Sequence, residues 1–363
     1  MSEAAGEWVD VGAAEDFKRS LLREARLGER LVAVSYKDGR FGVISNVCNH
    51  VGGPLGKRRL DGEFVVCPWH QYKFHRCTGE GEPGYEADKV PGYGVKEENG
   101  RLLVTAKPTS KRGHLPHEPH PLTRPTDRAP GPLRVGGIST TVMDAKNPRF
   151  STSEHLFGVA LDYARASFGA ETKMIKLNEL SFRHCEGYYS KAAKACTWPC
   201  SITAADPADE LTAVYDAAVH WADVFLVATP IRWGAASSLY YKMVERLNCV
   251  QNQITLNNKV LIRNKVAAFI ITGGQDGIQS VAGQMMGFFS EIGFLLPQFP
   301  FIAHSLGWEF EEMERNVELV EHSEALKAGA RDLVNRASEL SKALLERELA
   351  RAAIERGGRK ASA

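Results

Sequence analysis

In the second half of the chain, short apolar runs alternate with stretches whose apolar residues recur at helical spacing. Strand-like runs cover residues 133–139, 172–177, 224–228, 266–272 and 298–303, and helical stretches cover 151–168, 207–221, 236–250 and 279–292. Five β-rich runs separated by helices are typical of β-α-β units, whose parallel strands are joined by right-handed crossovers. This pattern predicts an α/β domain over residues 133–310, built on a doubly wound five-stranded parallel sheet.

The first 106 residues show a different pattern, with short strand-like runs at 31–36 and 41–45 and a hairpin at 64–67. We expect a separate all-β domain here, which makes the protein multidomain. Residues 107–132 contain seven prolines and little apolar content, which predicts a semi-extended linker. His114, His117 and His120 lie in this segment; they could bind a metal, but a solvated linker is favoured because prolines prevent a shared rigid face.

Residues 311–363 are expected to form a charged helical segment and a tail. Apolar positions 326, 330, 333, 337, 340 and 344 are spaced 4, 3, 4, 3 and 4 residues apart. They predict either a closing helix that packs on the sheet or a helix–helix dimer seam.

Composition narrows the class of protein. A length of 363 residues suggests two domains, and 44% apolar with 25% charged residues is ordinary for a globular protein. The net charge of +1 gives no reason to expect nucleic acid as a partner. Without a membrane-length apolar stretch or a targeting segment, and with seven cysteines in no paired framework, we expect a cytoplasmic protein that does not bind membranes.

The most specific motif is Cys-x-His followed 16 residues later by Cys-x-x-His, formed by Cys48, His50, Cys67 and His70. Two thiolates on one iron and two imidazoles on the other are the ligands of a Rieske-type [2Fe–2S] cluster. Zinc also accepts two Cys and two His, but zinc fingers pair like with like, whereas each loop here supplies one of each.

These residues resemble the Rieske family over about the first 105 positions. Neither loop carries a second cysteine beside its ligands, so the inter-loop disulfide of high-potential respiratory members is not available. The resemblance therefore implies a Rieske-type ferredoxin domain, or the Rieske domain of an oxygenase, with a cluster that passes one electron at a time.

Three loops follow strands of the second domain and carry small or hydroxyl side chains. The first runs from Ser139 to Ser153, and the others are Thr229-Pro230-Ile231-Arg232-Trp233-Gly234 and Thr272-Gly273-Gly274-Gln275. Ligands of an open parallel sheet bind at the carboxyl ends of its strands, so the loops should converge there. No Gly-x-Gly-x-x-Gly follows the first strand, and hydroxyls at a helix N-terminus suit a single phosphate. Plain turns are the alternative for the glycine loop.

Residues 134–308 resemble the flavodoxin-like NAD(P)H-dependent FMN reductases, within them the iron–sulfur flavoprotein branch, through the Thr-Pro-x-x-x-Gly and Thr-Gly-Gly loops. The resemblance implies that the FMN phosphate is held by Ser139, Thr141, Ser151, Thr152 and Ser153. It implies that Thr229, Pro230, Ile231, Arg232, Trp233 and Gly234, together with Thr272, Gly273, Gly274 and Gln275, border the isoalloxazine.

The sequence departs from that family at two places. Arg232 stands where an aromatic residue is usual; it is a candidate catalytic residue beside the flavin, or else an ordinary surface arginine. Cys185, Cys196 and Cys200 lie where the branch carries a compact cluster motif, but their spacing is not compact and Cys249 falls in a predicted helix. We expect no second iron–sulfur cluster.

The two resemblances together predict an NAD(P)H-dependent oxidoreductase that moves electrons between FMN and the [2Fe–2S] cluster and passes them to a small-molecule acceptor. The alternative is a reductase component or an electron carrier for a separate oxygenase or other redox protein. Related reductases build the flavin pocket at a dimer interface, which implies a homodimer or homotetramer.

Overall fold

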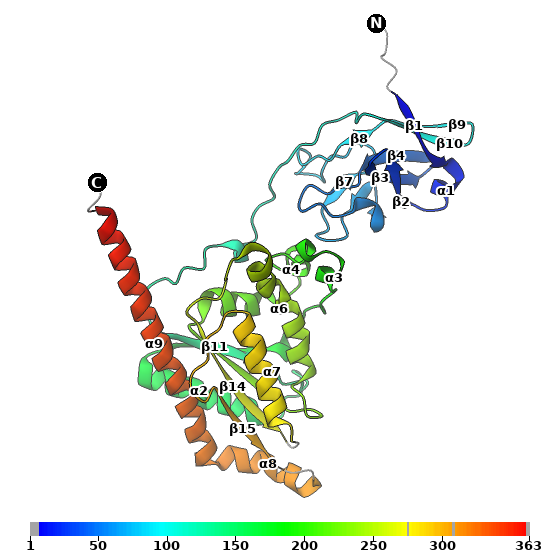
Figure 1. The fold of residues 1–363 in the computed structure, drawn as a ribbon. Coiled ribbons are helices and arrows are strands. Elements are labelled where there is room, and N and C mark those ends of the chain that lie inside the picture. Colours follow the sequence, from blue (N-terminus) through cyan, green and yellow to red (C-terminus); the bar gives the residue numbers. More distant parts are fainter. Residues whose placement is uncertain (1–6, 274–275, 307–308, 361–363) are drawn as a thin grey trace. The chain divides into compact units, whose positions relative to one another are not determined.

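The computed structural model describes residues 7–273, 276–306 and 309–360, and the chain divides into two compact units (Figure 1). The first unit contains the residues up to His120 together with Tyr188–Ala195. The second contains Pro121–Gly187 and the residues from Cys196 onward.

The first unit is built from three small antiparallel sheets. Their strand orders are β1-β10-β9, β2-β3-β4-β8 and β5-β6-β7. The strands are β1 (Trp8–Ala13), β2 (Leu22–Leu27), β3 (Arg30–Lys37), β4 (Arg40–Ser45), β5 (Arg59–Asp61), β6 (Phe64–Val66), β7 (Lys73–His75), β8 (Gly92–Tyr93), β9 (Val95–Glu98) and β10 (Arg101–Thr105). The short helical pieces are α1 (Ala14–Lys18), η1 (Leu55–Lys57), α3 (Tyr188–Lys191) and η4 (Ala193–Ala195).

The sheet β2-β3-β4-β8 is buried on both faces. Successive residues of a strand point to opposite faces, so Val32 and Val34 pack into one apolar cluster while Ala33 packs into the other. The second cluster also contains Cys48 and Cys67, so the two cysteine loops rest directly on the sheet.

The second unit contains five parallel strands in the order β12-β11-β13-β14-β15. They are β11 (Arg134–Ser139), β12 (Glu171–Lys176), β13 (Val224–Pro230), β14 (Val266–Gly273) and β15 (Phe301–Ser305). This order confirms the predicted doubly wound, flavodoxin-like sheet. Position 137 in β11 requires glycine, because a Cβ there would come within 1.8 Å of the Leu226 carbonyl oxygen on β13.

Helices cover both faces of this sheet (Figure 1). They are α2 (Thr152–Phe168), α4 (Ser201–Ala205), α5 (Thr212–Tyr215), the π-helix η5 (Asp216–Trp221), α6 (Ser238–Asn257), α7 (Ile278–Glu291), α8 (Phe310–His322) and α9 (Glu324–Lys360), with short turns η2 (Pro121–Thr123) and η3 (Leu177–Glu179). Leu226 of β13 packs with α2 and α9, whereas its neighbour Phe225 packs with α6 and α7. This alternation explains why the strands read as continuous apolar runs.

The structure resolves one alternative and corrects one predicted element. The helix predicted over 207–221 is a short α-helix that continues as a π-helix, and the charged helical segment predicted over 311–363 consists of two helices, α8 and α9. The spaced apolar positions of α9 pack against α2 and the sheet, with Leu333 and Ala337 fully buried. They therefore form the closing helix and are not available as a dimer seam.

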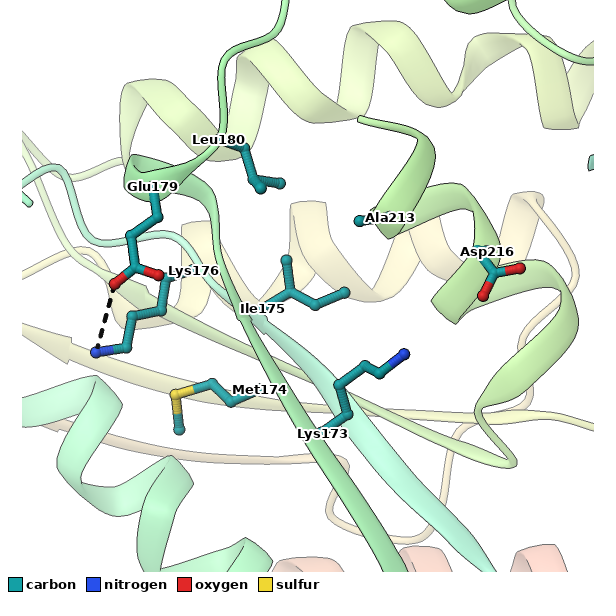
Figure 2. Close-up of a pocket in the computed structure, with 8 residues that line it drawn as sticks. All are labelled: Lys173, Met174, Ile175, Lys176, Glu179, Leu180, Ala213 and Asp216. Carbon is teal, nitrogen blue, oxygen red and sulfur yellow. Dashed lines mark ion pairs between the residues drawn. The ribbon is translucent and has the colours of Figure 1, made fainter. Parts of the chain in front are cut away.

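A cavity of about 500 Å³ lies beside the edge strand β12 (Figure 2). Lys173 and Lys176 reach it from β12, and Ala213 and Asp216 border it from α5 and the π-helix. Figure 2 shows Lys176 next to Glu179, with 4.0 Å between its Nζ and the carboxylate oxygen. The loops predicted to hold FMN do not line this cavity.

Candidate functional site

Two tight loops position the predicted cluster ligands in the first unit. In the first loop the Cys48 N–H donates to the Gly53 carbonyl over 3.0 Å, and the Gly52 N–H donates back to the Cys48 carbonyl. In the second loop the Cys67 N–H donates to the Tyr72 carbonyl over 2.8 Å. Each cysteine therefore sits at the base of a turn that is closed by backbone hydrogen bonds.

The structure brings all four predicted ligands together. The Cys48 and Cys67 thiols hydrogen-bond to each other and are almost fully buried, and the rings of His50 and His70 lie 4.3 Å apart. Gly53 leaves room beside this group, because a Cβ there would lie 2.7 Å from the Cys67 Sγ. Two buried thiols facing two imidazoles form the donor set that a Rieske [2Fe–2S] cluster requires.

The electrostatics of the four side chains suit metal binding. The thiol–thiol hydrogen bond raises the pKa of Cys48 and lowers that of Cys67 to about 7. Burial lowers the pKa of His70 to about 3, and the nearby His50 adds to this shift. Both effects favour one thiolate and a neutral imidazole, the forms that bind iron.

The two histidines differ in exposure. His50 is exposed, whereas His70 is only 6% exposed and hydrogen-bonds to the backbone of Ala195. Ala195 belongs to the segment Tyr188–Ala195, which the sequence places far from the ligand loops. Sequence reasoning missed this contact, because no periodicity or motif marks the segment.

Residues 107–120 also pack on the first unit, which differs from the solvated linker that the sequence favours. Arg112 donates to the carbonyl of Val47 over 3.1 Å, and Asn49 donates to the carbonyl of Gly113 over 2.8 Å. Lys89 and Gly113 exchange two backbone hydrogen bonds. The segment thus holds the loop that carries Cys48 and His50.

A buried carboxylate anchors two of the predicted linker histidines. Asp88 is 1% exposed, accepts a hydrogen bond from Asn49, and lies 3.3 Å from His114 Nδ1 and 3.5 Å from His117 Nε2. Within the described ranges, no three His, Cys, Asp or Glu side chains gather closely enough to hold a single metal ion.

An aromatic stack connects this segment to the cluster ligand His50. The His50 ring stacks on Tyr72 with 4.9 Å between centroids, and Tyr72 in turn lies 4.0 Å from His117. His117 also stacks on Tyr85 at 3.9 Å, so its ring lies between two tyrosines. These contacts identify Tyr72 and His117 as residues around the ligands that the motif itself does not reveal.

In the second unit the three predicted loops leave the neighbouring strands β11, β13 and β14 at the same edge of the sheet. The Thr140 hydroxyl donates to the Thr229 hydroxyl over 2.8 Å, and the Thr152 and Thr272 hydroxyls lie 2.7 Å apart. The Ser237 hydroxyl donates to the Thr140 carbonyl over 2.6 Å. These hydrogen bonds join all three loops into one polar cluster, to which sequence reasoning did not assign Thr140 or Ser237.

The helix α2 begins at the polar loop after β11. Ser151 caps it by accepting a hydrogen bond from the Glu154 N–H, and Ser153 and Thr141 are buried nearby. Ser139 donates to the Glu154 carboxylate over 3.0 Å, and Lys176 forms an ion pair with the same carboxylate over 2.5 Å. The pairing with Lys176 offsets the negative charge that Glu154 would otherwise present to a bound phosphate.

The two later loops pack closely against each other at the strand ends. The Ile231 N–H donates to the Thr272 carbonyl over 2.8 Å, and a Cβ on Gly273 would lie 2.7 Å from the Cβ of Ile231. Arg232 is exposed, and Trp233 is 89% exposed at the turn that Gly234 completes. Pro230 ends β13, whereas Gly274 and Gln275 lie outside the described residues.

Two histidines that the sequence did not single out border this edge of the sheet. His155 lies in the first turn of α2, and His304 lies opposite Thr272 in the register of β15. The Nε2 atoms of both are buried and have no hydrogen-bond partner among the residues that the structure describes. Buried polar atoms are normally satisfied, so a bound anion or polar ring beside them would complete their hydrogen bonding.

Comparison with known proteins identifies two domain families in this chain. Residues 7–94 match the Rieske [2Fe-2S] domain, and residues 142–308 match the NADPH-dependent FMN reductase family. The first match gives a [2Fe–2S] cluster, and not zinc, as the cofactor of the first domain. The second match gives FMN as the cofactor of the second domain.

Among individual proteins, a human Rieske domain-containing protein is 39% identical over 77 residues, which are 20% of this chain and 49% of that protein. The ferredoxin component of a naphthalene 1,2-dioxygenase/salicylate 5-hydroxylase system from Ralstonia sp is 25% identical over 97 residues, 27% of this chain and 93% of that protein. The crystal structure of RosB with a bound flavin-type intermediate aligns with 62% of this chain and 87% of its own, at 20% identity and a TM-score of 0.47.

The match to the human Rieske domain-containing protein spans about half of that protein's length. Human apoptosis-inducing factor 3 is 33% identical over 92 residues, which are 25% of this chain and 15% of that protein. These relatives therefore report on the Rieske domain alone. Across the described residues, no helix combines the length and the apolar composition that a membrane span requires.

Proposed function

Because one chain carries both a Rieske [2Fe–2S] domain and an FMN reductase domain, we propose that this oxidoreductase moves electrons from NAD(P)H through FMN to the cluster and then to a small-molecule acceptor. A flavin accepts a hydride as two electrons and a Rieske cluster carries one, so the pair converts two-electron into one-electron chemistry. The presence of both domains in one chain is the observation that carries the proposal.

In the first domain, Cys48 and Cys67 would hold one iron, and His50 and His70 the other. Support comes from the convergence of these four side chains and from the low pKa of His70, which keeps its ring neutral. The surrounding carboxylate, arginine and tyrosine contacts fix the orientation of the ligand loop, as outer contacts do at metal sites generally.

In the second domain, the start of α2 would hold the FMN phosphate through Ser151, Thr152 and Ser153, with Ser139 and Thr141 beside them. Free backbone N–H groups at a helix N-terminus bind phosphate well, and the orphaned Nε2 of His155 supplies a further donor. The flavin ring would lie over residues 229–234 and 272–275, where Arg232 can stabilise negative charge on a reduced ring or on a substrate carboxylate.

A second candidate function is electron delivery to a separate oxygenase. It is favoured by the match to a dioxygenase ferredoxin component over 93% of that protein's length, and by the exposure of His50. An exposed ligand edge allows a partner protein to approach the cluster closely.

An anaerobic assay separates the two functions. We expect NADPH oxidation to continue when a quinone or a nitro compound is added alone, with catalytic turnover. Stoichiometric NADPH oxidation that occurs only when an oxidised oxygenase is present as electron acceptor would instead favour the second function. If NADPH and NADH both fail to reduce the bound FMN, the proposed reductase activity is wrong.

A further inference from the structure

Cysteine residues that neither cofactor requires come together in the second unit. The thiols of Cys200 and Cys249 hydrogen-bond to each other, and Cys249 also donates to the carbonyl of Arg246 over 3.4 Å. Cys200 directly precedes α4, whereas Cys249 lies within α6, so two separate elements supply the pair. Both side chains belong to the same buried apolar cluster of the second unit.

A buried guanidinium is directed at one of these thiols. Arg246 Nε lies 3.3 Å from Cys200 Sγ, and the Arg246 side chain is fully buried. The rest of the guanidinium is fixed by Asp209, at 2.6 Å and 3.0 Å, and by Thr203, at 2.7 Å. A positive charge held against a sulfur atom favours the thiolate over the thiol.

A backbone N–H group also favours the thiolate form of Cys200. The Ile202 N–H donates to the sulfur of Cys200, and the hydrogen bond from Cys249 is the largest of the effects that lower the pKa of Cys200. Burial, together with the neighbouring Cys200, raises the pKa of Cys249. One sulfur is thus favoured as the thiolate and the other as the thiol, the two forms that a thiolate attack followed by disulfide closure requires.

We propose that Cys200 and Cys249 form a reversible dithiol/disulfide couple, a third redox centre in this protein, which reacts with small hydroperoxides. Cys200 is 8% exposed and Cys249 is fully buried, so a small oxidant reaches Cys200 first. Arg246 is a positioning residue that stabilises the attacking thiolate.

The reaction balances with one hydroperoxide per pair. With hydrogen peroxide, the Cys200 thiolate attacks one peroxide oxygen to form a sulfenic acid, the O–O bond breaks, and the departing hydroxide takes up a proton to give water; an organic hydroperoxide releases an alcohol at this step instead. The Cys249 sulfur then attacks the Cys200 sulfur, the S–O bond breaks, and a second water leaves with the Cys249 proton. The sulfur pair loses two electrons, the peroxide gains two, and a disulfide links the start of α4 to α6.

The test is peroxide titration of the intact protein with its cofactors bound, followed by blocking of free thiols, reduction, labelling of the released thiols and peptide mapping. We expect Cys200 and Cys249 to become labelled together, in equal amounts, and to return to thiols after reduction. The matched controls Cys77→Ser and Cys185→Ser should leave this pair unchanged. In Cys249→Ser, Cys200 should accumulate as a sulfenic acid that dimedone traps.

A second measurement tests the role of the guanidinium. Arg246→Lys keeps the charge but shortens its reach, and we expect the midpoint of the pH–rate profile of Cys200 oxidation to rise by about one pH unit, which lowers the rate about tenfold at pH values below that midpoint. The proposal is wrong if Cys200 and Cys249 stay separately alkylatable after peroxide treatment. It is equally wrong if purified protein carries iron beyond the two cluster atoms and Cys200→Ser removes that iron.

Discussion

At the residue scale, the cluster depends on two buried sulfur atoms that no neighbouring side chain can replace. Cys67 hydrogen-bonds to Cys48 at the base of its loop, whereas Cys77 contacts the carbonyl of Phe41, away from both ligand loops. We expect Cys67→Ser to abolish the Rieske electron paramagnetic resonance signal, because a thiolate ligand is required. Cys77→Ser should retain it. A full signal in Cys67→Ser would reject the ligand assignment.

The start of α2 gives a second prediction at this scale. Replacing Thr152 and Ser153 with alanine removes two hydroxyls from the proposed phosphate site, and we expect FMN to bind about 5- to 30-fold more weakly, as the loss of roughly 1–2 kcal/mol of hydrogen bonding implies. Fluorescence titration of the flavin-free protein measures this change. Thr255→Ala, on the exposed last turn of α6, is the control and should bind FMN normally.

In the double variant the Rieske signal should be unaffected, since the two sites lie in different units. Unchanged FMN affinity in this variant would exclude the α2 N-terminus as the phosphate site.

Lys265 provides a pH-dependent prediction. It is 5% exposed and donates to the Ala222 carbonyl, and burial lowers its pKa from 10.5 to about 8. Between these two pH values the unfolded chain binds a proton that the folded chain does not, so folding becomes more favourable as the pH rises. The unfolding free energy of the wild type minus that of Lys265→Met should therefore become more positive from pH 8 to pH 10.

The magnitude of this difference is at most about 1.4 kcal/mol per unit of pKa shift. Urea unfolding followed by far-ultraviolet circular dichroism at several pH values measures it. A difference that stays constant or shrinks over this range would show that Lys265 keeps an ordinary pKa.

At the scale of elements, the segment after β10 extends the Rieske domain. His117 lies between Tyr72 and Tyr85 and faces Asp88. Removing a buried aromatic pairing costs roughly 0.5–1.5 kcal/mol beyond the lost area. We therefore expect His117→Ala to lose the visible absorbance of the cluster several degrees earlier on heating, and His322→Ala, at an exposed position in the last turn of α8, to match the wild type. Equal melting of both variants would contradict the packing role.

The second sheet was predictable from the sequence because successive strand residues point to opposite faces of the sheet, and both faces are buried. Leu226 and Phe225 serve opposite faces, and a strand buried on both faces gives the continuous apolar run that the sequence shows. The strand ends then located the three loops. The π-helix at Asp216–Trp221 was not predictable, because its apolar spacing resembles that of an ordinary helix.

The Rieske domain was predictable because the spacing of its Cys and His residues is specific, but the surroundings of those residues were not. The contact of His117 with Asp88 joins residues 29 positions apart through a proline-rich segment that has no periodicity. The hydrogen bond of His70 to the backbone of Ala195 joins residues more than a hundred positions apart. Long-range side-chain contacts of this kind have no local pattern that a single sequence could reveal.

At the scale of the whole molecule, the proposed homodimer or homotetramer raises the question of whether electrons cross between subunits. Mixing a cluster-deficient variant, Cys67→Ser, with the Thr152→Ala/Ser153→Ala variant after FMN has been stripped from the latter tests this. If electrons cross, mixed oligomers should recover part of the NADPH-driven cluster reduction. Mixed oligomers with no recovery would confine transfer to one chain.

The central claim is that the flavin and the cluster exchange electrons within this protein, and anaerobic stopped-flow mixing with NADPH tests it most directly. We expect the flavin absorbance to bleach first and the Rieske signal of the reduced cluster to appear afterwards, at a rate independent of protein concentration. Flavin reduction that leaves the cluster oxidised throughout would contradict the account.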